Sequence, residues 1–129
     1  MHLPTDEEWT KLQNYLMAEG YSYDGVAGNN KIAKSLAMNS GWQTSSNSGA
    51  VGNSDYPEYR NITGFSAMPS GFRAFTGEFV NENQESYWWS ATEGNNDIFG
   101  NLNLKFDSAK MYTFHDNKKY GFSVRCIKD

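Results

Sequence analysis

The sequence predicts an α+β domain in which two helices come first and a small antiparallel sheet follows, with long irregular loops between them. Three observations lead to this prediction. Apolar residues recur at helical spacing in the first 40 residues, short β-like runs begin at Gly64, and clusters of Gly, Asn and Ser separate these segments. The chain of 129 residues is long enough to bury its own core, so we treat 1–129 as a single domain.

The first predicted helix is the segment "LPTDEEWTKLQNYLMAEG" (3–20). Thr5 is a suitable N-cap, and Glu8 stands three residues later, where it can complete a capping box. Apolar residues recur along one helical face: Trp9, Leu12 and Leu16. Gly20 can end the helix because glycine adopts the left-handed conformation of a helix C-terminus at little cost.

A second, shorter helix of two to three turns is predicted in "NKIAKSLAMNSGW" (30–42), with its end at Gly41. Its apolar stripe consists of Ile32, Ala33, Leu36 and Ala37. The following residues, up to about Asn61, are polar and rich in turn formers and show no period. We expect a long surface loop there, which is either functional or mobile.

Five short runs after Gly64 predict the strands: "GFSAMPSGFRAF", "YWWSAT", "FGNLNLKF", "KMYTFH" and "YGFSVRCI". In "NLNLKF" (101–106) apolar and polar residues alternate, which is the period of a half-buried antiparallel strand. The last run alternates in the same way, and its apolar phase is Tyr120, Phe122, Val124 and Cys126. We therefore expect each strand to have one buried and one exposed face. The predicted core is Trp9, Leu12, Leu16, Phe65, Trp89, Leu102, Leu104, Phe122 and Val124.

Two adjacent tryptophans stand in the run "YWWSAT". Neighbouring residues of a strand point to opposite faces of the sheet, so the two rings cannot enter the same layer. We assign Trp89 to the core and Trp88 to the opposite face, where it can form the base of a binding surface. The alternative is that both rings only fill the two sides of a thin sheet.

The predicted binding surface extends from Glu93 to Asn117, where amides and aromatic residues are frequent. Such side chains suit adaptable hydrogen bonding and stacking with a ligand. The candidate ligand-binding residues are Trp88, Asn95, Asn96, Asp97, Asn101, Asn103, Lys105, Tyr112, His115 and Asn117. The alternative is that these residues only form turns and the polar outer face that any half-buried sheet needs.

Composition excludes several classes of protein. The formal net charge is −4 and no basic run occurs, whereas nucleic-acid binding needs clustered Lys and Arg. No apolar stretch is long enough for a membrane span, and no signal-peptide pattern is present. Cys126 is the only cysteine, so neither an internal disulfide nor a zinc site with the usual Cys/His spacing is expected.

Four segments in this order and spacing, "HLPTDEEW", "TGFSAMPSGFR", "YWWSATE" and "YGFSVRCIKD", closely resemble the Fibrobacter succinogenes major paralogous domain of bacterial surface proteins and lipoproteins. That family is similar to the C-type lectin fold, in the branch that includes formylglycine-generating enzymes. The resemblance implies two helices packed on a small, twisted antiparallel sheet. It also implies that the protein lies at the cell surface or is secreted, as part of a larger surface protein or assembly.

Members of the family carry a strand-containing segment and a "CPSGW"-like stretch before the "HLPT" motif, whereas here Met1 directly precedes that motif. We therefore expect this chain to lack the N-terminal strand segment of the family. The resemblance implies that the cysteine missing with this segment is the partner that Cys126 would otherwise have.

Calcium and catalysis are the remaining alternatives. The EPN, QPD and WND triplets of calcium-dependent lectins are absent, although the oxygen-rich stretch "EGNND" (93–97) can supply calcium ligands as well as form a turn. We therefore expect no cofactor, with calcium as the alternative. Formylglycine-type oxidation looks to need a reactive cysteine pair, and the chain has only Cys126. Its two histidines, His2 and His115, suggest no nucleophile–base arrangement.

We therefore expect a non-enzymatic module that binds a protein or a glycan. One special case is a variable protein diversified by a retroelement, because such proteins resemble this fold with a "YWSST"-like scaffold. Mutagenesis of adenine-rich codons would leave an asparagine-rich surface like this one. The alternatives are a formylglycine-type oxidoreductase and a purely structural module of the cell envelope.

Overall fold

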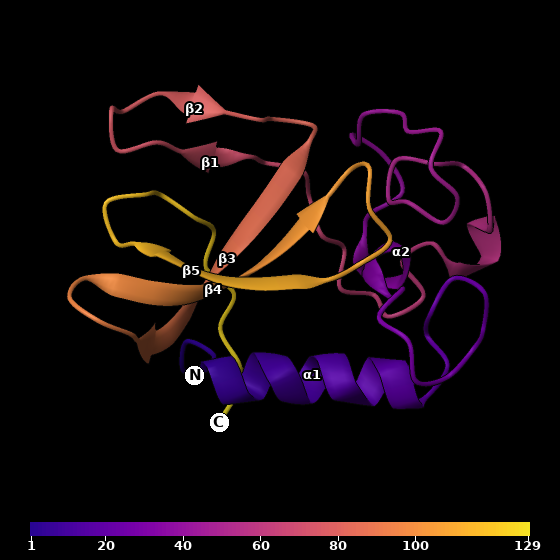
Figure 1. Ribbon diagram of the computed structural model, residues 1–129, viewed down its shortest axis with the longest axis horizontal. Helices are drawn as coiled ribbons and strands as arrows, with labels where there is room; N and C mark the ends of the chain where they lie inside the picture. The colour runs from indigo at the N-terminus through magenta and orange to yellow at the C-terminus, as the bar shows by residue number, and fades with distance from the viewer.

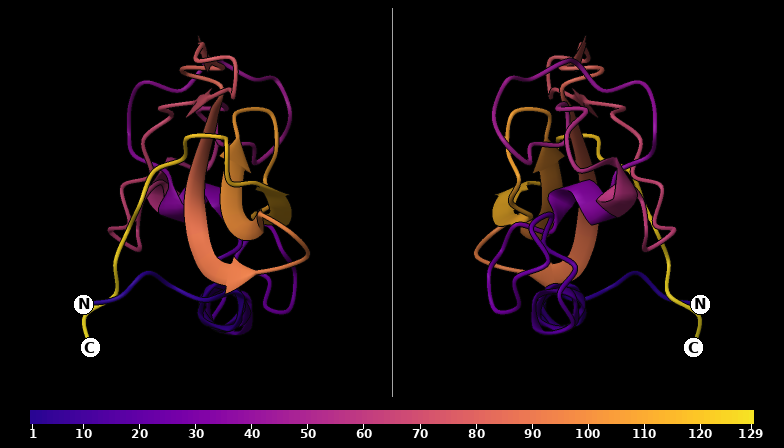
Figure 2. Two further views of the ribbon diagram at one scale, coloured as in Figure 1. Left: turned by 90° about the vertical axis from the view of Figure 1, so that its left-hand side faces the viewer. Right: turned by 90° about the vertical axis from the view of Figure 1, so that its right-hand side faces the viewer.

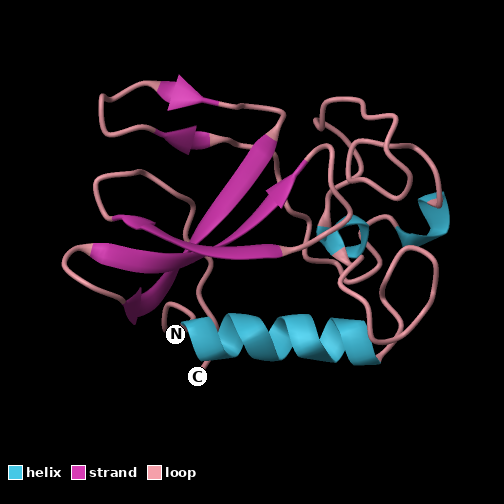
Figure 3. Cartoon of the chain, in the orientation of Figure 1, coloured by secondary structure: helices cyan, strands magenta, loops and turns pink.

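The computed structural model describes residues 1–129 and has the predicted α+β composition (Figure 1). Its elements, in chain order, are α1 (Asp6–Ala18), α2 (Ala33–Leu36), a 3-10 turn (Pro57–Tyr59), β1 (Phe72–Arg73), β2 (Phe79–Val80), β3 (Glu85–Glu93), β4 (Ile98–Lys105) and β5 (Tyr112–Asn117). Most of the chain between α1 and β3 is irregular, as Figure 3 shows in pink. The predicted order of helices first and strands second is confirmed.

Helix α1 forms as its sequence predicts. The Thr5 hydroxyl accepts a hydrogen bond from the backbone N–H of Glu8 at 3.2 Å, and the Glu8 carboxylate accepts one from the backbone N–H of Thr5 at 3.0 Å. This capping box satisfies two N–H groups that would otherwise lack partners at the helix start. Trp9 and Leu16 are buried, and Gly20 has the positive φ of +78° expected after a helix end.

Helix α2 is a single turn, so the prediction of two to three turns ending at Gly41 is wrong. The predicted apolar stripe is fully buried, but so are the polar residues of the turn. The segment is buried on all sides, and the backbone groups at its end bond to the segment around Ala67 instead of continuing the helix. Met38 donates to the carbonyl of Ala67, and Ala67 donates to the carbonyl of Leu36.

The segment from 43 to 61 is irregular, as predicted, apart from the 3-10 turn (Pro57–Tyr59), but it is not a loop confined to the surface. Ala50 and Val51 are fully buried. The ammonium group of Lys34, also fully buried, donates to the carbonyl of Asn53 at 2.8 Å and forms an ion pair with the Asp55 carboxylate. The interior contacts of this segment therefore fix it to α2.

Strands β3, β4 and β5 form one antiparallel sheet in that order, and β1 and β2 form a separate hairpin. Trp88 pairs with Leu102, which in turn pairs with Thr113, so these three residues share one face. A register shift interrupts the β3–β4 ladder between Trp89 and Glu93. Helix α1 lies along one side of this sheet, and the β1–β2 hairpin lies on the other side (Figure 1).

The last predicted strand, "YGFSVRCI", does not form. Its residues make isolated bridges to three different partners, since Gly121 pairs with Arg73, Ser123 with Trp88 and Ile127 with His2. Figure 2 shows this C-terminal segment in yellow, ending beside the N-terminus. Between Ser123 and Ile127 no continuous ladder determines which side chains point inward. Val124 is therefore 62% exposed and Cys126 is exposed, against the prediction that both point inward.

The core lies between α1, α2 and the three-stranded sheet. Four of its predicted members are buried: Trp9, Leu16, Leu102 and Leu104. Leu12 and Phe65 pack against this cluster as partly buried residues. Trp88 takes the position in the core that was predicted for Trp89.

Candidate functional site

The paired tryptophans point to opposite faces of β3, as predicted, but the faces are exchanged. Trp88 is buried on the face toward α1, where its ring meets Phe65 edge-on at 5.3 Å. Trp89 lies on the other face, with its ring 4.3 Å from Phe122 and 6.4 Å from Phe99. Trp88 therefore belongs to the core and does not form an accessible binding platform.

Asn101 and Asn103 lie on the same sheet face as Trp89, but they are only 2% and 0% exposed. The prediction that this face of β4 is exposed is wrong. Each asparagine stands between larger cross-strand neighbours, because Asn101 pairs with Trp89 and Phe114, and Asn103 pairs with Tyr87 and Tyr112. Short amides between large rings are covered by them.

The buried asparagines form a short hydrogen-bonded row. Asn103 donates to the side-chain oxygen of Asn101 at 3.1 Å, and Asn101 donates to the Asp116 carboxylate at 2.7 Å. The side-chain oxygen of Asn103 is buried and accepts no hydrogen bond. This row places polar groups inside a second, aromatic layer of the fold instead of offering them to a ligand.

Lys105 and Tyr112, at the end of this row, are held by neighbouring side chains. The Lys105 ammonium lies 3.9 Å from the Glu85 carboxylate and 5.5 Å from the centre of the Tyr112 ring. The Tyr112 hydroxyl lies 2.9 Å from the Ser108 hydroxyl. Both residues are half-buried, so they can contribute only part of their surface to a ligand.

Asn95, Asn96 and Asp97 form the exposed turn between β3 and β4. The Asp97 carboxylate pairs with the Lys118 ammonium at 2.9 Å, which raises the pKa of Lys118. Beside it, Asn117 accepts a hydrogen bond from the backbone N–H of Lys119 at 2.9 Å. The turn and residues 117–119 therefore form one corner at the end of the sheet, in which Asn117 is half-buried and Lys118 and Lys119 are exposed.

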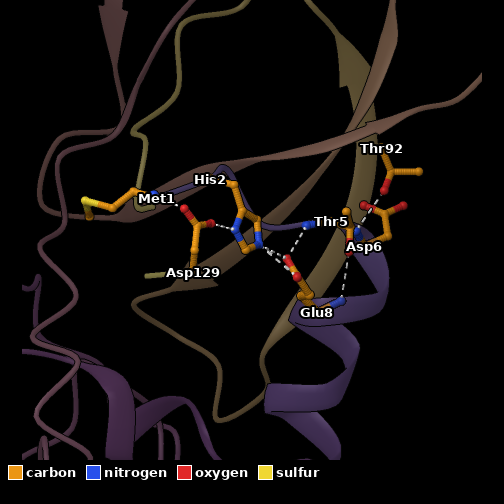
Figure 4. Close-up of polar contacts among 7 residues, drawn as sticks. All are labelled: Met1, His2, Thr5, Asp6, Glu8, Thr92 and Asp129. Carbon is orange, nitrogen blue, oxygen red and sulfur yellow. Dashed lines mark hydrogen bonds and ion pairs between the residues drawn. The ribbon is translucent and has the colours of Figure 1, made fainter. Parts of the chain in front are cut away.

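His115, on the edge strand β5, contacts the start of α1. Its Nε2 atom lies 2.9 Å from the Asp6 carboxylate. The backbone N–H of Asp6 donates to the Thr92 hydroxyl at 2.9 Å, a contact drawn in Figure 4. A Cβ atom at Gly100 would clash with the Asp6 carboxylate, so a larger residue there would displace this side chain.

A cleft of about 230 Å³ lies between α1 and β5, at this Asp6–His115 pair. Its lining consists of Asp6, Trp9, Thr10, Asn101, Thr113, Phe114 and His115. It offers a carboxylate, an imidazole and two threonine hydroxyls. The indole N–H of Trp9 is buried and has no hydrogen-bond partner.

The sequence predicted two residues of this cleft, His115 and Asn101, but not the three from α1. Asp6 and His115 are 109 residues apart, and no local pattern indicates that they meet. The motif "HLPTDEEW" favours a helix start, so its acidic residues are accounted for by capping alone. The fold, and not the motif, brings Asp6, Trp9 and Thr10 to the predicted surface.

The other histidine joins the two ends of the chain (Figure 4). His2 contacts Asp129 through Nδ1 at 2.8 Å and Glu8 through Nε2 at 2.9 Å. These hydrogen bonds, with that to Asp129 the stronger influence, raise the pKa of His2. The pKa of Glu8 is lowered, first by the N–H of Thr5 and then by His2. The amino group of Met1 also contacts Asp129.

Two further findings concern metal binding and membrane insertion. No group of three or more His, Cys, Asp and Glu side chains is arranged to hold a metal ion. None of the helices has both the length and the apolar character that crossing a bilayer requires.

The model of the Fibrobacter succinogenes major domain family matches residues 1–128, nearly the whole chain. This match confirms the resemblance seen in the four sequence segments. No curated protein and no solved structure matches the chain significantly.

Proposed function

The chain belongs to the Fibrobacter succinogenes major domain family, and from this premise we propose that it is a non-enzymatic binding module with a C-type-lectin-like fold. Two helices before a small antiparallel sheet, with long irregular segments between them, are compatible with that fold. We place the module in a larger protein that is secreted or displayed at the cell surface.

The cleft between α1 and β5 is the observation that supports this proposal most. Its β5 side belongs to the predicted surface, and its other side is formed by α1. Thr10, Thr113 and His115 are exposed, so their hydroxyl and imidazole groups are accessible to a ligand. Binding sites commonly combine such a concave surface with a few convergent polar groups.

We favour a glycan over a protein as the ligand. A volume of about 230 Å³ is small for a ligand pocket and suits a single sugar residue. Sugar hydroxyls can both donate and accept, which matches a cleft that contains a carboxylate acceptor, hydroxyls and an imidazole. The exposed turn at Asn95, Asn96 and Asp97 lies at the end of the same sheet and can contact further residues of a longer glycan.

The other functions have less support. The hypothesis of diversification by a retroelement depends on exposed asparagines, whereas Asn101 and Asn103 are buried. Freely varied side chains at these two positions would disturb the hydrogen-bonded row. The resemblance implies that a formylglycine-type oxidoreductase needs a reactive cysteine pair. This chain has only one cysteine, Cys126.

A glycan array tests the proposal. The wild-type domain is expected to bind at least one glycan, and a double variant, Thr113→Val with His115→Ala, is expected to lose this binding while keeping its melting temperature. Thr44→Val, at an exposed threonine of the irregular segment, is the matched control and should bind as the wild type does. The proposal fails if no glycan is bound, or if the double variant binds as well as the control.

A further inference from the structure

A groove lies away from the cleft, between the β1–β2 hairpin and the C-terminal segment. Its volume is about 380 Å³, within the usual range for a small-ligand pocket. Figure 1 shows the hairpin on the side of the sheet opposite α1. A ligand in this groove would therefore not meet one in the cleft.

The groove carries an exposed aromatic ring. Phe79 is 80% exposed and is the cross-strand partner of Arg73, so both side chains lie on the same face of the hairpin. Beside the groove, Phe75 is also exposed and packs its ring 5.2 Å from that of Tyr120. Such a cluster of exposed aromatic side chains is unusual on the surface of a protein that has no partner there.

The groove also contains a cation that has no acidic partner. Arg73 lines it, and this guanidinium forms no ion pair in the structure, although the chain carries a formal net charge of −4. Its Nε atom donates a long hydrogen bond of 3.4 Å to the carbonyl of Gly77, and its centre lies 5.7 Å from the Phe79 ring. The contact with the ring positions the guanidinium and leaves its other N–H groups free.

Two hydroxyls complete the polar part of the groove. The Oγ atoms of Ser70 and Ser123 are 3.5 Å apart, at the outer limit of a hydrogen bond. Either hydroxyl can rotate to donate to a ligand instead. The groove thus combines donors and a positive charge with the exposed ring of Phe79.

We propose that this groove binds a carboxylate next to an apolar group, and specifically the free C-terminus of a peptide that ends in an apolar residue. Arginine binds carboxylates through two parallel hydrogen bonds. A C-terminal residue carries its side chain on the carbon next to the carboxylate, so the two groups can reach Arg73 and the neighbouring Phe79 ring together. An Asp or Glu side chain would bring a polar backbone to this ring, and a uronate would bring hydroxyls.

Calorimetric titration of the wild-type domain with the peptide acetyl-Gly-Ser-Val-Leu tests this inference. The form with a free carboxylate should bind at least tenfold more tightly than the form with a C-terminal amide. Arg73→Gln should weaken binding of the free acid by a similar factor and remove the difference between the two forms. Lys110→Gln, which removes an exposed positive charge elsewhere, should change neither affinity.

The inference is overturned if the acid and the amide bind equally, if neither binds the wild type, or if Arg73→Gln has no effect on the acid. Tighter binding of glucuronate than of the peptide would also overturn it, since the occupant would then be a sugar acid. Thermal unfolding of each variant verifies that it is folded. The double variant of the α1–β5 cleft should bind the peptide normally, so the result does not depend on the proposed glycan site.

Discussion

Asn101 is a polar strand residue whose side chain is buried. Its side chain donates to Asp116 and accepts from Asn103, and almost none of its surface is exposed. Buried polar groups stabilise a fold only when their hydrogen bonds are satisfied. If one partner is removed, the remaining buried group lacks a hydrogen bond, which destabilises the fold. Asn101 connects the other two members of the row.

Asn101→Ala is expected to lower the free energy of unfolding by about 1–3 kcal/mol, because both of its hydrogen-bond partners lose a bond inside a covered layer. Asn95→Ala is the matched control, since Asn95 is exposed in the β3–β4 turn, and should change stability by no more than about 0.5 kcal/mol. Urea denaturation measures both values. Equal losses would show that the amide row is not part of the fold.

His2 supplies a pH-dependent contact between the chain ends. Its pKa is raised above 6.5 by Asp129 and Glu8, so protonated His2 stabilises the contact below pH 6.5. This contribution is lost as the pH rises through the raised pKa. In an NMR titration of the imidazole, His2 should titrate above 6.5, and Asp129→Asn should move its pKa back toward that value. An unchanged pKa in the variant would contradict the assigned contact.

Among the elements, α2 shows how a buried charge can organise an irregular segment. Burial lowers the pKa of Lys34, and Asp55 opposes this effect. The pKa of Asp55 is lowered as well, since hydrogen bonds from Lys34 and from the N–H of Gly49 outweigh its own desolvation. The ion pair therefore connects the short helix to the segment that includes Asp55.

Lys34→Ala should destabilise the domain by about 3 kcal/mol, because it leaves a void and an uncompensated Asp55 carboxylate. Lys31→Ala is a matched control, since Lys31 also pairs with an aspartate, Asp24, but at the surface. This change should cost no more than about 1 kcal/mol. Urea denaturation compares the two, and a Lys31 variant as unstable as the Lys34 variant would contradict the role given to burial.

The elements that could be predicted from sequence are those with local causes. The capping box and the apolar spacing suffice for α1, and the alternation in 101–106 indicates β4 and its inward leucines. The burial of the opposite face could not be predicted, because it depends on aromatic rings from two other strands. The C-terminal segment alternates like a strand, but it has a separate partner at each bridge and so forms no ladder.

Over the whole molecule, two grooves lie at separate places around one sheet. The cleft brings together α1 and β5, whereas the Arg73 groove brings together the β1–β2 hairpin and the C-terminal segment. The β5 side of the cleft could be predicted from the polar and aromatic residues of that strand. The α1 side depends on the packing of a helix from one end of the chain against a strand near the other end.

The most direct test of the proposed function is an NMR titration of the ¹⁵N-labelled domain with the glycan that binds best on the array. Shift changes should centre on the backbone amides of Asp6, Thr10, Thr113 and His115, and should disappear in the Thr113→Val, His115→Ala variant. Changes centred on Arg73 and Ser123, or no changes at all, would contradict the assignment of the α1–β5 cleft as the glycan-binding site.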